Sequence, residues 1–507
     1  MISKPITIYK IIITGLTVFI LTAACNSVPG KITDTITRSV NKSELEKVIK
    51  HYRQAGDNRK LKALYFLLEN IDYHQHMEGT GIDNYNKIFG ELAKTPESRK
   101  ECLEVIFDSL TAANNGNNWG AFTTIRDFNS IHASHLISHI DAAFAAWERP
   151  WAKHLSFEEF KEYILPYKVL EENPDQWMVA IQHSYNDVNF DTDNPYKACL
   201  LINDLIKRRF TIRTLPSFSD LNFGQLEKIR SGKCGHAAQY TAYVMRSFGV
   251  PVAIDYSPWG NMNGEHTWNA LIYKGKPIPF VGSESNPGKT KIDQALNRKR
   301  SKIYRHSYSI QKQELQFLTQ NTEEIPDRFK SYYIRDVTKQ YIPVSDIQVQ
   351  LDTSHTMSYA YLCVFNSRTW IPVYWGKCTH NTVLFKDMGR GIVYLPAKYE
   401  NNELKAVAAP VILHQNGDTE ILHIKPDQRR QVTLKKKSPY GPNIVKGNEY
   451  SLYYWDSAWK LLESKMATAN SIVFEQVPDN ALLWVRSKDK PVNERPFIFK
   501  NGEQVWY

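Results

Sequence analysis

The sequence predicts an α+β protein of several domains, and three observations carry this prediction. The chain has 507 residues, which is more than one hydrophobic core usually organises. Residues 43–215 carry apolar side chains at helical spacing, whereas residues from about 340 onward alternate apolar and polar side chains between turn signals. Between these regions one helix is followed by strands. We therefore expect a helical N-terminal region, an α+β core and two C-terminal β-sandwich-like modules.

The expected division of the chain follows these changes of pattern. It consists of a lipoprotein signal peptide at 1–24, a tether at 25–42, a helical N-terminal domain at 43–170, an α+β core at 171–335, a first β module at 336–434 and a second β module at 440–507.

The N-terminus has the pattern of a bacterial export signal. Lys4 and Lys10 precede an apolar stretch, residues 11–21, that is too short for an ordinary membrane span. This stretch runs into Thr22-Ala23-Ala24-Cys25, and small residues before a cysteine are typical of a lipobox. The sequence thus predicts an exported protein with a lipid anchor at Cys25 in the cell envelope, with the outer membrane as the expected location. The alternative is a secretory signal in which the cysteine falls by chance.

The helical region has recognisable starts. Ser43 with Glu46, and Ser156 with Glu159, have the spacing of a capping box. The residues before the first of these, 26–42, are polar and lack an apolar period, so they are expected to form a flexible tether.

The β-rich region repeats itself. Trp370 to Phe385 is a step of 15 residues, and so is Trp459 to Phe474. Further along, an Asn-Gly turn follows each copy. We therefore expect two β modules of similar structure.

The charge balance argues against nucleic acid as a partner. The formal net charge is +10, but no basic stripe interleaved with aromatic residues is present. The basic runs at 298–300 and 435–437 are interpreted as solvated linkers.

Cys234 stands just before a predicted helix. Apolar and small residues recur at helical spacing from Ala237 to Phe248, and Gly249 ends the pattern. The first turn of a helix presents unpaired N–H groups and partial positive charge, which stabilise a thiolate. A cysteine at this position is expected to have a lowered pKa and to act as a nucleophile.

A strand that carries His266 follows the helix. Residues 250–254 are predicted to form one strand and residues 264–273 a second, before Lys274-Gly275-Lys276 turns the chain into a third. A helix-borne cysteine facing a strand-borne histidine is the geometry of a Cys–His pair, in which the imidazole accepts the thiol proton and later returns it to the leaving group. Cys234 and His266 are therefore the expected catalytic pair.

These motifs together resemble a known family. They are Gly232-x-Cys234, Phe248-Gly249-Val250-Pro251, His266-x-Trp268-Asn269 and Lys274-Gly275-Lys276-x-Ile278-Pro279. In combination they resemble the papain-like core of the transglutaminase-like superfamily. Upstream, the run from Glu159 to Tyr167 is similar to lipoproteins of Bacteroidetes bacteria that carry this core. The resemblance covers residues 155–335, and it implies Cys234 as the nucleophile and His266 as the base.

The third residue of the family pattern is missing. An Asp usually follows the His by about fifteen residues and orients it, but Val281 stands there and cannot accept a hydrogen bond. Glu284 is the nearest acidic substitute, and a bend at Gly282 is expected to bring it toward the imidazole. The alternative is that Glu284 is a solvated loop acid.

Four further residues are expected at the cleft. Gln225 is a candidate oxyanion donor beside the backbone N–H of Cys234. Asn269 is an alternative partner for the imidazole. Trp259 lies in the loop between the cysteine helix and the histidine strand, and Trp268 belongs to the histidine motif.

Neither a cofactor nor a metal is expected. The zinc alternative uses Cys234, His236 and His266, but no second cysteine motif supports it. The other metal alternative uses His132, His135 and His139 on one helical face, which more often form a polar flank.

Five cysteines remain after Cys25. Cys363 and Cys378 fall in one β module and could form a disulfide, because the envelope permits it. Cys102 and Cys199 are interpreted as buried thiols.

The expected function is hydrolysis or transfer at an amide or peptide bond through a thioester on Cys234. The substrate would be a peptide, a protein or another amide, and the oligomeric state is left open. The alternative is a catalytically inactive module that binds peptide or glycan at the cell envelope, because the orienting Asp is absent.

Overall fold

The computed structural model describes residues 28–114, 118–185, 187–216, 220–288, 298–351, 357–439, 443–487 and 494–507. The expected signal peptide and the lipidation site Cys25 lie outside these residues. The protein is built of helices and sheets together, with several β-sheets in its C-terminal part. Within the described ranges, no helix is both long and apolar enough to cross a membrane.

The N-terminal part is helical. Its main helices are α2 (Gly30–Arg38), α3 (Lys42–Gln54), α4 (Asn58–Asn70), α5 (Thr80–Leu92), α6 (Leu103–Ala113), α7 (Ala133–Trp147), α8 (Phe157–Tyr163), α9 (Trp177–Ser184), α10 (Pro195–Arg209) and α11 (Phe223–Ile229). Two short strand pairs lie among them: β1 (Gln75–Glu78) is antiparallel to β2 (Thr123–Arg126), and β3 (Thr211–Ile212) is parallel to β4 (Ser231–Gly232). One hydrophobic cluster runs from Ile32 to Tyr308, so the helical region and the α+β core share one core.

Residues 30–38 correct the expectation of a tether. They form α2, and Ile32 and Ile36 are buried in the core. Their spacing of four puts both side chains on one face of the helix, and this single apolar stripe is enough to dock a short helix against α4.

The two capping-box predictions had different outcomes. Ser156 and Glu159 form the predicted capping box of α8. The prediction for Ser43 and Glu46 was wrong, because α3 begins two residues earlier, with Asn41 at its N-cap and no side-chain cap.

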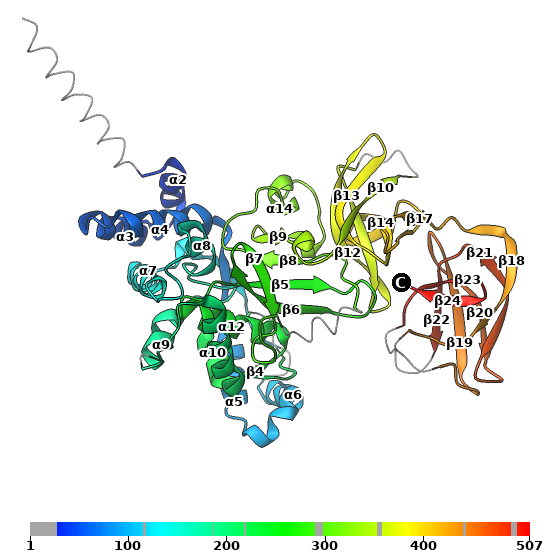
Figure 1. The fold of residues 1–507 in the computed structure, drawn as a ribbon, viewed down its shortest axis with the longest axis horizontal. Coiled ribbons are helices and arrows are strands. Elements are labelled where there is room, and N and C mark those ends of the chain that lie inside the picture. The colour runs from blue at the N-terminus through cyan, green and yellow to red at the C-terminus, as the bar shows by residue number, and fades with distance from the viewer. Residues whose placement is uncertain are drawn as a thin grey trace, which may run out of the picture.

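The core sheet has five strands in the order β7-β6-β5-β8-β9. Their bounds are β5 (Val252–Pro258), β6 (Glu265–Tyr273), β7 (Lys276–Phe280), β8 (Tyr304–His306) and β9 (Ile334–Asp336). The helix α12 (Cys234–Ser247) packs on one face, against β5 and β6. Lys274 and Gly275 join β6 to β7 with positive φ at both residues, which is the turn that suits a two-residue hairpin. Figure 1 shows this sheet between the helices and the C-terminal β modules.

A buried ion pair lies within the core sheet. The guanidinium of Arg305 on β8 donates two hydrogen bonds of 2.7 Å to the carboxylate of Asp255 on β5, and Tyr341 donates a third. The paired carboxylate and the Tyr341 hydroxyl raise the pKa of Arg305 far above its ordinary range, so the pair stays charged.

The two C-terminal modules repeat one strand order. The first contains β10 (Val344–Gln350), β11 (Tyr359–Asn366), β12 (Thr369–Thr379), β13 (Thr382–Gly389), β14 (Ile392–Glu400), β15 (Glu403–Ala406), β16 (Val411–Leu413) and β17 (Thr419–Ile421). The second contains β18 (Lys425–Leu434), β19 (Glu449–Asp456), β20 (Ala458–Met466), β21 (Ile472–Asp479), β22 (Leu483–Ser487), β23 (Phe497–Lys500) and β24 (Glu503–Trp506). The first pairs β10 with β13 and orders β12-β11-β14-β16-β17, while the second pairs β18 with β21 and orders β20-β19-β22-β23-β24. The sequence repeat therefore corresponds to a repeat of topology.

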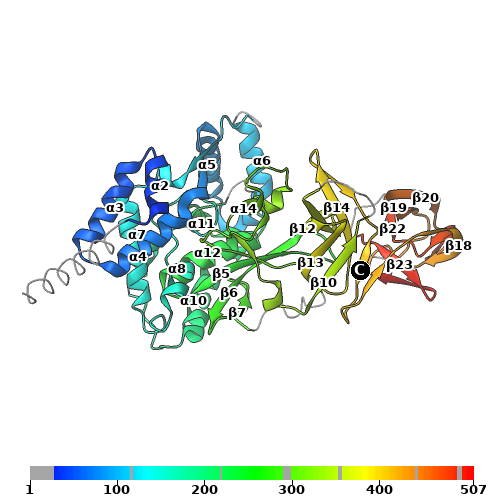
Figure 2. The same cartoon turned by 90° about the horizontal axis from the view of Figure 1, so that it is seen from above.

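The modules meet through equivalent aromatic residues. Trp370 and Trp459 stack with ring centroids 6.4 Å apart and planes at 6°. Trp370 also lies 5.5 Å from Trp455, which is the cross-strand partner of Trp459. In the same way, Trp459 lies 5.6 Å from Phe365, which is the cross-strand partner of Trp370. The contact is thus reciprocal. Figures 1 and 2 show the second module at the end of the molecule far from the helices.

Candidate functional site

Cys234 is the first residue of α12 and is partly exposed. Two residues before Cys234, there is no room for a side chain at Gly232, because a Cβ there would lie 2.6 Å from the Cβ of His236. The backbone N–H of Lys233 donates to Nδ1 of His236 at 3.2 Å, which satisfies one of the unpaired donors at the helix start. From Ala237 onward the helix is buried. The helix start is therefore held in place by its own first turn.

The cysteine and His266 lie at the same end of the sheet. Near the start of α12, the amide of Asn269 donates to the carbonyl of Ala238 at 2.9 Å. Near its end, the guanidinium of Arg246 donates to the carbonyl of Val252, and Val252 pairs with Leu271. The helix thus runs in the same direction as β6, and its Cys234 end lies where β6 begins.

The side chain of His266 lies on the sheet face opposite α12. Alternate residues of a strand point to opposite faces. Asn269 and Leu271 contact α12 and its core, so His266 and Trp268, which are out of phase with them, lie on the other face. Among the residues that the structure describes, no hydrogen bond joins Cys234 to the ring of His266.

Tryptophan and arginine side chains surround the imidazole. The ring centroids of Trp259 and Trp268 each lie 6.0 Å from that of His266, with nearly parallel planes. The guanidinium of Arg300 lies 4.4 Å from the Trp268 ring and 5.0 Å from the Trp259 ring. Burial, followed by Arg300 and Arg298, lowers the pKa of His266 to about 4. The imidazole is therefore neutral at neutral pH, and in this environment it is a weaker base than an ordinary histidine.

The Arg300 contact corrects the interpretation of residues 298–300 as a solvated linker. Arg300 is 5% exposed and covers both tryptophans of the cleft. In the other basic run, Lys437 is also buried and donates to Ser487. These contacts could not be predicted from the basic runs themselves, because the contacting residues are distant in sequence.

Glu284 is exposed in a turn that follows β7. Its backbone N–H donates to the carbonyl of Val281 at 3.0 Å. The neighbouring residues Ser283 and Ser285 are tied to Asn203 on α10. No hydrogen bond between described residues joins the Glu284 carboxylate to His266.

Val281 occupies the position that the family pattern gives to an Asp. Phe280 pairs with Asn269, so the next residue along β7 lies opposite Trp268 and on the His266 face. Val281 is 3% exposed and packs with Trp268. An acid at this position would therefore share a face with the imidazole, one step diagonally along the strand pair.

The remaining cleft residues have structural partners. The side chain of Gln225 accepts a hydrogen bond from the backbone of Asn222 and donates to Asn86 at 2.8 Å. Its amide is therefore engaged away from Cys234. Trp259 and Trp268 are 3% and 1% exposed, so they wall the cleft and present little surface to a ligand.

The five cysteines that the structure describes are free thiols. Cys363 pairs with Pro372 and Cys378 pairs with Val383, so the strand register does not bring the two thiols into a disulfide. Cys199 is buried as expected, whereas Cys102 is exposed at the start of α6, which corrects the interpretation of it as buried.

The histidines of α7 are mostly engaged in the helical core. His139 is buried, and its ring donates to the carbonyl of Leu165 at 2.9 Å. Burial lowers the pKa of His139 to about 3 and that of His135 to about 4. His132 is exposed. Over the described ranges, no cluster of three or more metal-ligating side chains occurs.

Comparison with solved structures gives a weak likeness to a protein of another bacterium. No family model and no curated protein matches the sequence. A crystal structure of a candidate cysteine protease from Cytophaga hutchinsonii is 16% identical over 26% of this chain and 50% of that chain, with a TM-score of 0.19. The chain thus spans about half the length of that protein.

Proposed function

We propose that the protein is a transglutaminase-like cysteine hydrolase or acyltransferase that acts on amide bonds at the bacterial cell envelope, anchored by a lipid on Cys25. The observation that carries the proposal is the position of Cys234. It is a partly exposed thiol at the first residue of a long buried helix, and it lies at the end of the sheet where β6 begins and carries His266 as its second residue.

In this proposal the Cys234 sulfur attacks the amide carbonyl. A bond forms between sulfur and the carbonyl carbon, and the carbon–nitrogen bond breaks. The thiol proton passes to the neutral ring of His266 and then to the departing amine. Water or a second amine then cleaves the thioester. The N–H groups at the start of α12 would stabilise the thiolate and the developing oxyanion.

The proton transfer requires a side-chain movement. The ring of His266 faces Trp259 and Trp268, and it must turn toward the Cys234 end of α12 to approach the sulfur. Catalytic hydrogen bonds commonly tighten only when substrate is bound.

Alkylation by iodoacetamide tests the proposal, and the protein contains its own control. Cys102 is an exposed thiol outside the site. Cys234 should be alkylated faster than Cys102 although both thiols lie at a helix start, because only Cys234 has an imidazole, that of His266, at the same end of the sheet to accept its proton. Cys378 should react more slowly than either, because burial raises the pKa of its thiol to about 11. Equal rates at Cys234 and Cys102 would count against a nucleophilic thiol.

A second candidate function is a catalytically inactive binding module. The closed arrangement of Trp259, Trp268 and Arg300 around His266 favours it. Activity profiling on peptide and protein amides separates the two functions. Loss of turnover in Cys234→Ala with retained binding supports the enzyme, whereas binding without turnover in the unmodified protein supports the binding module.

A further inference from the structure

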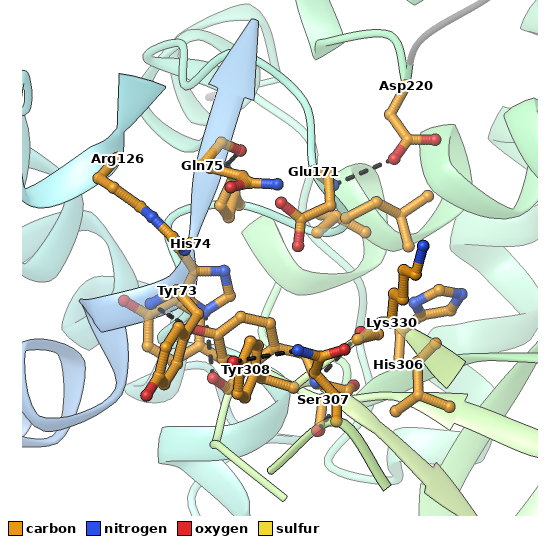
Figure 3. A pocket seen from close by; sticks show the side chains of 18 of the residues that line it. Tyr73, His74, Gln75, Arg126, Glu171, Asp220, His306, Ser307, Tyr308 and Lys330 are labelled. Atoms are coloured by element: carbon orange, nitrogen blue, oxygen red, sulfur yellow. Dashed lines mark hydrogen bonds between the residues drawn. The ribbon is translucent and has the colours of Figure 1, made fainter. Parts of the chain in front are cut away.

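A second cavity lies at the opposite end of α12 from Cys234. Its volume is about 430 Å³, and Arg246 near the end of α12 forms part of its wall. With a rise of about 1.5 Å per residue, Arg246 lies about 18 Å along the helix from Cys234. Most of the remaining wall comes from four separated segments, 73–75, 168–171, 306–308 and 330–334, and single residues complete it: Arg126, Asp220, Gln316 and Asn321. Figure 3 shows their side chains around the cavity.

Most charged groups of this cavity are paired within the protein. The ammonium of Lys168 contacts Asp127 at 2.8 Å, and that of Lys330 contacts Asp327 at 2.8 Å. Asp220 accepts the backbone N–H of Glu171 at 3.1 Å. The carboxylate of Glu171 differs, since no hydrogen bond or ion pair joins it to another residue within the described part of the chain. Glu171 is exposed to the cavity, and Figure 3 shows its carboxylate near the centre.

One cation of the wall also has no acidic partner. Arg126 on β2 forms no ion pair with the residues that the structure describes, and its guanidinium lies 5.5 Å from the ring of Tyr73. Tyr73 is stacked on Tyr332 at 3.6 Å. The cavity therefore retains an unpaired guanidinium and an unpaired carboxylate, supplied by different elements, together with an aromatic surface.

A buried hydrogen-bond acceptor adds to this pattern. His74 is 3% exposed and is stacked between Tyr333 and Tyr308, at 3.7 and 4.3 Å. Burial lowers the pKa of His74 to about 3, so the ring is neutral. Its Nε2 donates to the carbonyl of Tyr308, which leaves Nδ1 as an acceptor, and Nδ1 has no donor among the described residues.

We propose that this cavity binds a small zwitterion, an amino acid or a short peptide with free termini. Its ammonium group would contact Glu171 and Asp220, and its carboxylate would contact Arg126. Carboxylates and aromatic faces together are a favourable environment for an ammonium group, and a guanidinium matches a carboxylate in geometry. The proposal does not depend on catalysis at Cys234.

Proton release gives the site a measurable signature. Although Glu171 keeps exposed surface toward the cavity, the protein around its carboxylate desolvates it and raises its pKa to about 8, and burial raises the pKa of Asp220 to about 6. At pH 7 the empty cavity therefore holds about one proton on Glu171, and an ammonium ligand favours its carboxylate form. Binding should release up to about one proton, and affinity should rise about tenfold per pH unit as the pH approaches 8. Above that pH the amine of the ligand itself loses its charge.

Titration calorimetry with alanyl-alanine tests the proposal on the full chain. Measurements at pH 7 in two buffers of different ionisation enthalpy give the number of protons released. N-acetyl-alanyl-alanine lacks the ammonium group and alanyl-alanine amide lacks the carboxylate, so each should bind at least about tenfold more weakly.

Two variants assign the contacts. Glu171→Gln should weaken alanyl-alanine binding at least about tenfold and abolish proton release, while leaving the weak binding of the acetylated dipeptide unchanged. Arg126→Gln should remove the preference for alanyl-alanine over its amide. Both side chains are at least partly exposed, and urea unfolding checks the fold. Glu91→Gln, at an exposed helix position away from the cavity, is the matched control.

The outcomes are distinct from those at Cys234. Cys234→Ala should bind alanyl-alanine as the unmodified protein does. Absence of binding up to millimolar dipeptide, or binding that Glu171→Gln leaves unchanged, would overturn the proposal whatever the thiol does.

Discussion

Replacing Gly232 with alanine should disturb the start of α12. The added Cβ would lie 2.6 Å from the Cβ and 2.7 Å from Nδ1 of His236. Ordinary carbon contacts are about 3.5–4.0 Å, so the first turn of α12 must move by about 1 Å. Overpacking of this kind costs about 1–3 kcal/mol, and loss of the hydrogen bond from Lys233 to His236 costs about 0.5–1.5 kcal/mol more.

The matched control is Gly235→Ala, in the same helix. A Cβ at Gly235 meets nothing within 4 Å, and alanine favours a helix over glycine by up to about 1 kcal/mol. Urea unfolding should therefore show Gly232→Ala destabilised and Gly235→Ala unchanged or stabilised. Alkylation of Cys234 should slow only in Gly232→Ala. The double variant Gly232→Ala/His236→Gly should recover part of the loss. Equal urea midpoints for the two single variants would refute the reasoning.

Three further predictions follow from buried charge and from the imidazole. Val281→Asp should raise the pKa of His266 from about 4, because both side chains share one face, and an unchanged NMR titration would show that they do not meet. Asp255→Ala should lower stability to urea by about 3–5 kcal/mol, because it leaves Arg305 buried without its partner; adding Arg305→Met should recover much of that loss, and no recovery would argue against a charge effect. Lowering the pH from 6.5 to about 4 should destabilise the fold, because the unfolded chain takes up protons before the histidines whose pKa is lowered in the folded state. The carboxyl groups whose pKa is raised to about 6 or higher, Glu171, Asp175, Asp220 and Glu314, act in the opposite direction but are fewer. The urea midpoint should therefore fall over that interval, and a flat profile would contradict this balance. These histidines are His74, His135, His139, His236, His266 and His306.

The hairpin of the core sheet could be predicted from sequence because its signals are local. The expected strand at 264–273 is observed as Glu265–Tyr273, and the turn at Lys274 follows it directly. The alternation of side chains and the Gly-containing turn each act within a few residues, so their effect does not depend on contacts with the rest of the chain. The repeat of the β modules could also be predicted from sequence, because each copy keeps the same spacing between a tryptophan and a phenylalanine.

The surroundings of the imidazole could not be predicted in the same way. Arg300 reaches Trp259 and Trp268 only after the chain has passed through two more strands, and a basic run usually indicates solvent. The same holds for the second cavity, whose wall joins segments up to 260 residues apart, as in the bond between Tyr73 and Tyr333. Such sites depend on tertiary packing, which no window of sequence describes.

For Glu284 the sequence left two possibilities open, a partner of His266 brought near by a bend at Gly282 and a solvated loop acid. In the structure, Asn203 on α10 fixes the turn through Ser283 and Ser285. A Cβ at Gly282 would lie 1.9 Å from the hydroxyl of Thr241, so the bend is pressed against α12. The direction of an exposed loop side chain is set by such neighbours, which the sequence pattern does not identify.

The reciprocal contact of Trp370 and Trp459 has a consequence for the origin of the two β modules. Equivalent residues that touch one another, with cross contacts that mirror each other, are the arrangement found at the two-fold axis of a homodimer. Duplication of a self-associating ancestor within one gene would produce it and would convert association between subunits into an intramolecular step. Once joined, the halves are free to diverge, and Phe365, which stands in the first module where the second has Trp455, is one such divergence.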